Sequence, residues 1–154
     1  MIGTEGVLDD APAGVFYRTT GSPGSLASTV AQVFLGVRIE CAQCHHHPFD
    51  RWSQTDYYGM QAYFTQATFK STSRGPMLGA FAEAVTKHQR TNEEIFAHPL
   101  GREMPNASPP GDRRKLLAEW MASPENPWFA RNYVNRVWAH LTGRGIIEPV
   151  DDLR

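Results

Sequence analysis

The sequence predicts a mainly α-helical fold in which short helices are joined by long irregular loops. Three observations support this prediction. Apolar residues recur at three-and-four spacing in several separate segments, which is the pattern of one buried helix face. Residues that favour helix starts precede these segments. Stretches rich in glycine and proline separate them.

The first half of the chain is expected to hold two helices after an irregular lead-in at residues 1–24. The first helix is predicted at Ser25–Arg38. Its apolar face consists of Leu26, Val30, Val33, Phe34 and Val37. The second helix is predicted at 52–66, because Ser53 and Asp56 form a pair that resembles a capping box, with Asp in place of Glu or Gln.

Residues 67–111 are expected to be a loop or linker, because their composition favours turns over periodic structure. The one exception is a short helix predicted at Leu78–His88. The sequence thereby divides into residues 1–66, the linker 67–111 and a second organised block at 112–154.

The second block is expected to contain two helices. Asp112 is a candidate cap for the first of them, and Ser123–Pro124 ends it. Asn126 is a candidate cap for the next helix, predicted at 126–142, and Gly143 is a plausible left-handed end. The apolar stripe of that last helix consists of Ala130, Val134, Val137, Trp138 and Leu141.

Charge and hydropathy argue against two classes of function: strong electrostatic binding of nucleic acid or anionic membranes, and membrane spanning. The net charge is −1, so no strong field attracts nucleic acid or an anionic membrane. The only basic run, Arg113–Lys115, is interpreted as a solvated helix start. No apolar stretch approaches the ~20 residues that a membrane-spanning helix needs. The first residues also lack the charged and apolar regions of a secretory signal.

The strongest chemical signal is Cys41-Ala42-Gln43-Cys44-His45, which uses both cysteines of the chain. Cys-x-x-Cys-His is the attachment signature of c-type haem. In this interpretation Cys41 and Cys44 form thioethers with the haem vinyl groups, and His45 is the proximal iron ligand. Because such attachment occurs outside the cytoplasm and no export signal is visible, we expect the chain to be a fragment of a larger exported protein.

Three other interpretations of the motif remain open. A zinc site would pair Cys41 and Cys44 with two of the histidines, although structural zinc sites place the second ligand pair farther along the chain. The candidates are His45, His46, His47, His88 and His98. A thioredoxin-like dithiol would need a helix that follows the motif, whereas here a helix is predicted before it. Finally, the two thiols could be a plain disulfide or simply buried.

Further residues are candidates for contact with a haem. Met104, in a proline-rich loop, is the first choice for a distal ligand, with Met60 and Met77 as weaker choices; a bis-histidine site would recruit His88 or His98. Aromatic residues after the motif could wall a porphyrin, but ordinary core is the favoured interpretation. They are Trp52, Tyr57, Tyr58, Tyr63 and Phe64.

Two stretches of the chain resemble known families. The first comprises Phe34–Trp52 and Asp56–Gly59. It is similar to the planctomycete cytochrome-c-like domain, a domain of unknown function in large exported bacterial proteins. The second resembles the domain that usually follows it. This second stretch comprises Asp112–Arg114, Leu117–Trp120, Ser123–Arg131, Val134–His140, Gly143–Gly145 and Glu148–Asp152.

The resemblance implies that residues 1–66 are the C-terminal part of the first domain, and that 112–154 begin the following helical domain. It also implies a haem-like motif at Cys41, Cys44 and His45, with a second family histidine at His47. His46 departs from the family, which often has Asn or Asp there. No reaction follows from the resemblance, so whether the parent protein is an enzyme stays undecided.

We therefore predict c-type haem binding and electron transfer within an exported, periplasmic or extracellular, multidomain protein. The partners expected are an unidentified redox protein and the rest of the parent chain. Neither nucleic acid nor a membrane span in this segment is expected. The alternative is a module without haem, either zinc-binding or purely structural.

Overall fold

A computed structural model describes residues 1–154 and contains five α-helices and five short strands in two antiparallel sheets. The fold is therefore a mixture of helix and sheet, and the predicted mainly α-helical class is wrong. The helices are α1 Val15–Thr20, α2 Pro23–Val30, α3 Gln54–Thr65, α4 Arg113–Ala122 and α5 Phe129–Thr142. The strands are β1 Gly6–Val7, β2 Ala67–Thr72, β3 Gly75–Ala80, β4 Val85–Lys87 and β5 Glu94–Phe96.

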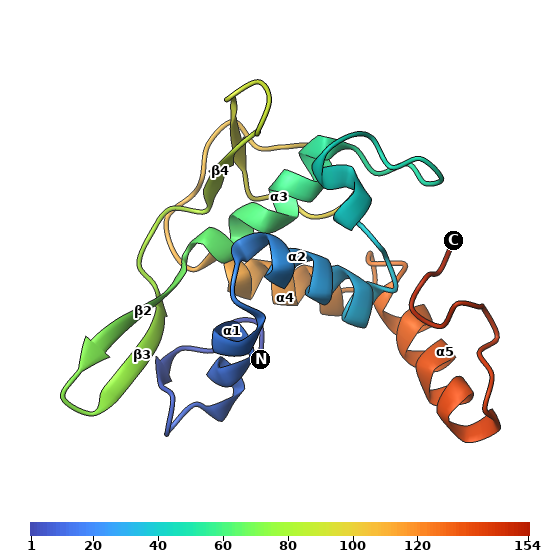
Figure 1. Ribbon diagram of the computed structural model, residues 1–154, viewed down its shortest axis with the longest axis horizontal. Coiled ribbons are helices and arrows are strands. Elements are labelled where there is room, and N and C mark those ends of the chain that lie inside the picture. Colours follow the sequence, from blue (N-terminus) through green and yellow to red (C-terminus); the bar gives the residue numbers. More distant parts are fainter.

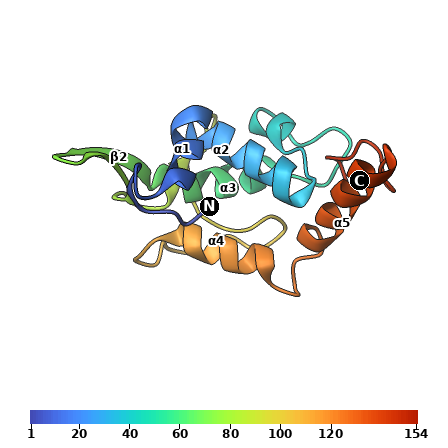
Figure 2. The same ribbon diagram turned by 90° about the horizontal axis from the view of Figure 1, so that it is seen from below.

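Four of the helices form two layers. Helices α1, α2 and α3 lie on one side and α4 lies on the other, as the second view shows (Figure 2). The β2–β3 hairpin extends from one end of the molecule, and α5 with the C-terminus lies at the opposite end (Figure 1). None of the helices has both the length and the apolar character that crossing a membrane requires.

Much of the predicted linker 67–111 is β structure. Strands β2 and β3 pair from Ala67↔Ala80 to Thr72↔Gly75, and β1 adds to the other edge of β3. Every residue of β2 after Ala67 is exposed, so this strand has no buried face. Without a buried face a strand shows no alternation of apolar and polar residues, which is why its composition resembled a loop.

The helix predicted at Leu78–His88 does not form. Leu78 belongs to β3, where it pairs with Phe69 of β2, and Val85–Lys87 form β4, which pairs with β5. The lead-in at residues 1–24 is also more ordered than expected, because it contains β1 and α1. Tyr17 of α1 is buried in the core.

The predicted helix at Ser25–Arg38 is shorter and is interrupted. Helix α2 begins after Ser22, whose hydroxyl accepts the amide hydrogen of Ser25 at 3.1 Å. A wider π-type turn covers Ala31–Leu35, and Gly36 then adopts a left-handed conformation with φ +64°. A Cβ at Gly36 would lie 2.7 Å from Oδ1 of Asn132, so glycine also allows close packing on α5.

The capping box at the start of α3 is confirmed. The Ser53 hydroxyl accepts the Asp56 amide hydrogen at 3.1 Å, and the Asp56 carboxylate accepts the Ser53 amide hydrogen at 2.9 Å. The second Asp56 oxygen accepts from the amide of Gly101 at 3.1 Å. Helix α3 is at the centre of the core. The five aromatic residues considered as porphyrin walls, four in α3 and Trp52 just before it, are all buried, as the favoured core interpretation predicted.

Helix α4 begins at the predicted cap, because Asp112 accepts the Arg114 amide hydrogen at 3.0 Å. The solvated interpretation of Arg113–Lys115 is wrong for Arg114, whose side chain is fully buried. Its guanidinium binds both Asp112 oxygens and lies over the Tyr17 ring. A buried arginine is tolerated here because a carboxylate and an aromatic face replace its water.

Helix α5 ends at Gly143 as predicted, with φ +80°. It begins at Phe129 rather than near Asn126, since the Asn126 side chain accepts from the amides of Trp128 and Phe129 just before the helix. Its buried residues are Asn132 and Asn135. The predicted apolar stripe faces outward instead, with large side chains exposed at Val134, Val137, Trp138 and Leu141.

Candidate functional site

The Cys-x-x-Cys segment is a single turn of 3₁₀-helix, Glu40–Gln43, followed by Cys44. A 3₁₀-helix has three residues per turn, so side chains at i and i+3 lie on the same side. Cys41 lies in the turn and Cys44 directly follows it, so this geometry favours placing the two thiols on one side. Both are free thiols and both are exposed, whereas Ala42 between them is fully buried and anchors the turn on the core.

Helix α3 holds the end of this turn in place. The carbonyl oxygen of Gln43 accepts two hydrogen bonds, from the Gln54 amide at 3.2 Å and from the Tyr58 hydroxyl at 3.1 Å. Both donors are buried residues. The peptide that leads into Cys44 is thus fixed to a rigid element, which positions the second thiol.

His45 has the tautomer that an iron ligand needs. Its Nδ1 lies 2.6 Å from the carbonyl oxygen of His46. A carbonyl oxygen can only accept, so in the neutral ring Nδ1 carries the hydrogen and Nε2 keeps its lone pair. Metal-bound histidines commonly use such a bond to a backbone carbonyl, which fixes the tautomer and ring orientation. The His45 side chain is exposed, so Nε2 is accessible.

His47 and His88 have the opposite tautomer. Nδ1 of His47 accepts the amide hydrogen of Phe49 at 3.3 Å, and Nδ1 of His88 accepts from the amides of Arg90 and Thr91. In the neutral ring the hydrogen then resides on Nε2. In this conformation neither Nε2 offers a lone pair to a metal.

In the neutral ring, His98 keeps a lone pair on Nε2, but the side chain lies in the core. Its Nδ1 donates to the carbonyl of Phe96 at 2.8 Å, and its side chain is 3% exposed against Gly59 of α3. No group of three or more His, Cys, Asp or Glu side chains is placed to hold a metal ion. The structure therefore does not bring together the four ligands that the zinc interpretation would use.

Met104 lies in the loop between β5 and α4, and its side chain is 39% exposed. The alternative methionines differ, because Met60 is fully buried in the core and Met77 lies in β3. The assignment of Met104 or His47 as a second iron ligand stays a prediction.

The residues of the turn fit a c-type haem in their donor chemistry. Cys41 and Cys44 offer two accessible thiols, and His45 offers an accessible Nε2 beside them. The turn itself supplies little apolar cover, since the two cavities that border it are lined mainly by polar side chains. The aromatic side chains that the sequence offered as a possible porphyrin wall are buried in the core instead.

The contacts that hold the turn were not foreseen in the sequence. Gln54 and Tyr58 bond to a carbonyl eleven and fifteen residues away, and no short-range pattern encodes such a pairing. The C-terminal residue Asp151 also reaches this region, where Gln32 and Arg38 donate to its carboxylate. Burial would raise the pKa of Asp151, but these two donors outweigh it and lower the pKa.

Comparison with known proteins gives two matches and two negative results. No curated protein matches the chain, and no solved structure matches it. Residues 18–69, which include the Cys-x-x-Cys-His turn, match the family model "PSCyt2: Protein of unknown function (DUF1549)". Residues 113–154 match the model "PSD1: Protein of unknown function (DUF1553)". The chain thus carries matches to two domains of unknown function that occur in tandem.

Proposed function

We propose that the turn at Cys41–His45 attaches a c-type haem and that the chain transfers electrons within an exported multidomain protein. The observation that carries this proposal is the His45–His46 contact. It leaves Nε2 of His45 free beside two accessible thiols. Tautomer, exposure and spacing all have the form that covalent attachment and proximal ligation need.

Each residue has a defined task in this proposal. Cys41 and Cys44 would hold the group through thioether bonds, formed when each S–H adds across a vinyl group, so no oxidant is consumed. His45 would donate its Nε2 lone pair, while its Nδ1–H stays on the His46 carbonyl. The bound iron would supply one-electron redox chemistry. Gln54 and Tyr58 would keep Cys44 in place through the Gln43 carbonyl.

The proposal also places the parent protein in the periplasm or outside the cell, where attachment of this kind occurs. An unidentified redox protein and the remainder of the parent chain would be its partners. Met104 is the proposed distal ligand. His47 is the weaker candidate, because it would first have to give up the contact of its Nδ1 with the Phe49 amide before it could present a nitrogen lone pair to iron.

The test is expression with an export signal in a periplasm that contains haem-attachment machinery. We expect the intact mass to rise by one haem, and the visible spectrum to survive acid–acetone extraction. Cys41→Ala combined with Cys44→Ala should abolish the gain in mass. Protein that carries only zinc, or nothing, under these conditions would contradict the proposal and favour a zinc-binding or structural module.

A matched pair of variants tests the axial role. His45→Ala and His46→Ala change adjacent exposed histidines, but only His45 has the free Nε2 defined by its backbone contact. We expect His45→Ala to change the spectrum of the attached haem and His46→Ala to leave it unchanged. The distal ligand has its own readout, the near-infrared methionine-to-ferric band, which should disappear in Met104→Ala. If the wild type shows the band and Met104→Ala retains it, Met104 is not the ligand.

A further inference from the structure

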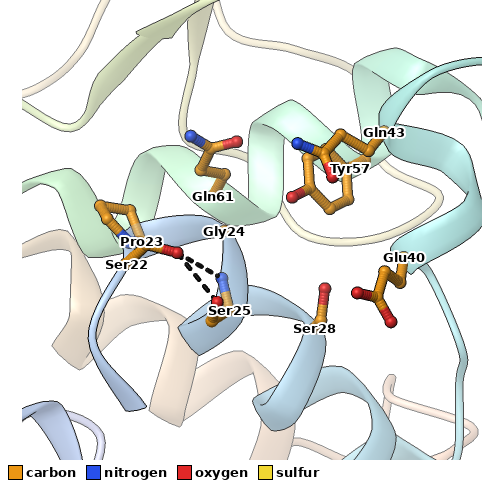
Figure 3. A pocket seen from close by; sticks show the side chains of 9 residues that line it. All are labelled: Ser22, Pro23, Gly24, Ser25, Ser28, Glu40, Gln43, Tyr57 and Gln61. Atoms are coloured by element: carbon orange, nitrogen blue, oxygen red, sulfur yellow. Dashed lines mark hydrogen bonds between the residues drawn. The ribbon is translucent and has the colours of Figure 1, made fainter.

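A polar cavity of about 250 Å³ lies between the N-terminal end of α2, the 3₁₀ turn and α3 (Figure 3). Only one of its nine lining residues is hydrophobic. The lining residues are Ser22, Pro23, Gly24, Ser25, Ser28, Glu40, Gln43, Tyr57 and Gln61. The cavity is thus formed by three elements that are far apart in sequence.

Most of the polar groups in this lining are available to a ligand. Among the nine residues, Figure 3 shows hydrogen bonds only between Ser22 and Ser25, at 3.1 and 2.9 Å. The two hydroxyls, one carboxylate and two amide groups of the remaining side chains make no such bonds to one another. They belong to Ser28, Tyr57, Glu40, Gln43 and Gln61.

Tyr57 is the most informative member of the lining. The residue is only 2% exposed, so its ring belongs to the core, yet its hydroxyl reaches the cavity. Gly24 makes this possible, because a Cβ there would lie 2.6 Å from the Tyr57 hydroxyl. The nearby Ser28 hydroxyl lowers the pKa of Tyr57. Burial dominates and raises the pKa of Tyr57, so the group stays a neutral hydroxyl that can donate and accept.

The charge of the lining limits the class of ligand. Glu40 is its only charged residue, and no cation faces it across the cavity. A phosphate or carboxylate would be repelled by Glu40 and would find no positive partner. An apolar ligand would strip water from several polar groups without replacing their hydrogen bonds, which is costly.

We propose that this cavity binds a small neutral polyhydroxylated molecule of about one sugar ring. Each hydroxyl of such a molecule both donates and accepts, which matches a lining of serine and tyrosine hydroxyls and amide groups. The Glu40 carboxylate accepts from two neighbouring hydroxyls of the ligand. The volume lies just below the usual range of small-molecule sites, which begins near 300 Å³, so the cavity takes a single ring. Binding needs no haem and is independent of the proposed function.

The test is titration of the full chain with D-glucose, D-galactose and myo-inositol. Binding is detected by NMR, as changes in the chemical shifts of backbone amides in α2 and the 3₁₀ turn. Cyclohexanol, sodium phosphate and methylammonium chloride serve as single-hydroxyl, anionic and cationic probes. We expect saturable shifts with at least one of the three polyols and none with the other probes.

Two variants locate the binding. Tyr57→Phe removes only the hydroxyl and should raise the dissociation constant about fivefold, the effect of one net hydrogen bond. Tyr63→Phe is the matched control on the same helix, because Tyr63 is equally buried but does not line the cavity. Gly24→Ala puts a methyl group against the Tyr57 hydroxyl and should abolish binding, while alanine keeps α2 helical.

The proposal is overturned if no polyol gives saturable shifts. Equal affinity in Tyr57→Phe and Tyr63→Phe would also overturn it, because binding would then lie elsewhere. Binding of phosphate, methylammonium or cyclohexanol in place of the polyols would assign the cavity to another ligand class.

Discussion

Arg114 and Asp112 form a bidentate ion pair inside the core, with Nε to Oδ1 at 2.9 Å and Nη2 to Oδ2 at 2.8 Å. The Arg114 side chain is fully buried and that of Asp112 is 6% exposed. The same guanidinium lies 3.7 Å from the carboxylate of Glu5 and stands over the ring of Tyr17. One arginine at the start of α4 thus ties the second matched segment to the N-terminal part of the chain.

Asp112→Ala should strongly destabilise the protein, because it leaves the buried Arg114 charge with only the more distant carboxylate of Glu5. Loss of one member of a buried pair costs about 3 kcal/mol or more. The control is Asp10→Ala, which breaks the exposed pair with Arg74 and should cost under about 1 kcal/mol. Urea denaturation of both variants measures the difference. Equal midpoints would show that the buried pair adds nothing beyond a surface one.

The same pair predicts how stability depends on pH. Burial would raise the pKa of Asp112, but the bonds and charge of Arg114 outweigh it and lower the pKa. The carboxyl therefore binds a proton more weakly in the folded state than in the unfolded state, where its pKa is about 3.9. Its contribution to stability is complete above that value and is lost as pH falls through the lower folded pKa.

We expect the free energy of unfolding to fall as the pH drops below about 4, and to fall less steeply in Asp112→Asn. Denaturant titrations at a series of pH values provide the measurement. A wild type and variant with parallel pH profiles would remove Asp112 as the cause.

Tyr58→Phe should loosen the Cys-x-x-Cys turn. It deletes one of the two hydrogen bonds to the Gln43 carbonyl, at a cost of about 1 kcal/mol. The peptide beside Cys44 then gains freedom, so Cys44 should react faster with iodoacetamide, as followed by mass spectrometry. Tyr63→Phe is the control, because burial raises the pKa of Tyr63 to about 12 and its hydroxyl does not hold the turn. Unchanged alkylation in Tyr58→Phe would mean that this bond does not position the thiol.

Gly59→Ala in α3 sets a gain in helix propensity against a steric clash with His98. Alanine in a helix interior normally gains up to about 1 kcal/mol over glycine. Here its Cβ would overlap the buried imidazole of His98, and overpacking a core costs about 1–3 kcal/mol. We expect the clash to dominate, so thermal unfolding should occur at a lower temperature. The double variant Gly59→Ala with His98→Ala should lose less stability than the sum of the two single changes, since the smaller side chain removes the clash.

Substitutions on the exposed and buried faces of α5 should differ in their effect on stability. Leu141 is 75% exposed, so Leu141→Glu should leave stability almost unchanged. Asn135 is 2% exposed and holds the backbone of Ile147 through both its donor and its acceptor. Asn135→Ala should cost about 1–3 kcal/mol because buried backbone groups lose their partners. Urea denaturation of the two variants measures the difference, and a large stability loss in Leu141→Glu would contradict the exposed assignment.

The sequence by itself determined the features that depend on residues close together in the chain. The Ser53–Asp56 capping box, the Asp112 cap and the Gly143 helix end all form where they were predicted. Each involves groups within a few residues, so local chemistry is enough to specify them. The spacing of Cys41 and Cys44 is also visible in the sequence, and the structure places Cys41 in a 3₁₀ turn that Cys44 directly follows.

Only the tertiary structure decided which faces are buried and which distant groups meet. The β2–β3 hairpin has no buried stripe to reveal it, and α5 buries asparagines where its pattern predicted valine and leucine. Arg114 is buried because Asp112, Glu5 and Tyr17 converge on it. The free energy of burying a polar group depends on its partners, and those partners lie at sequence separations that no local pattern records.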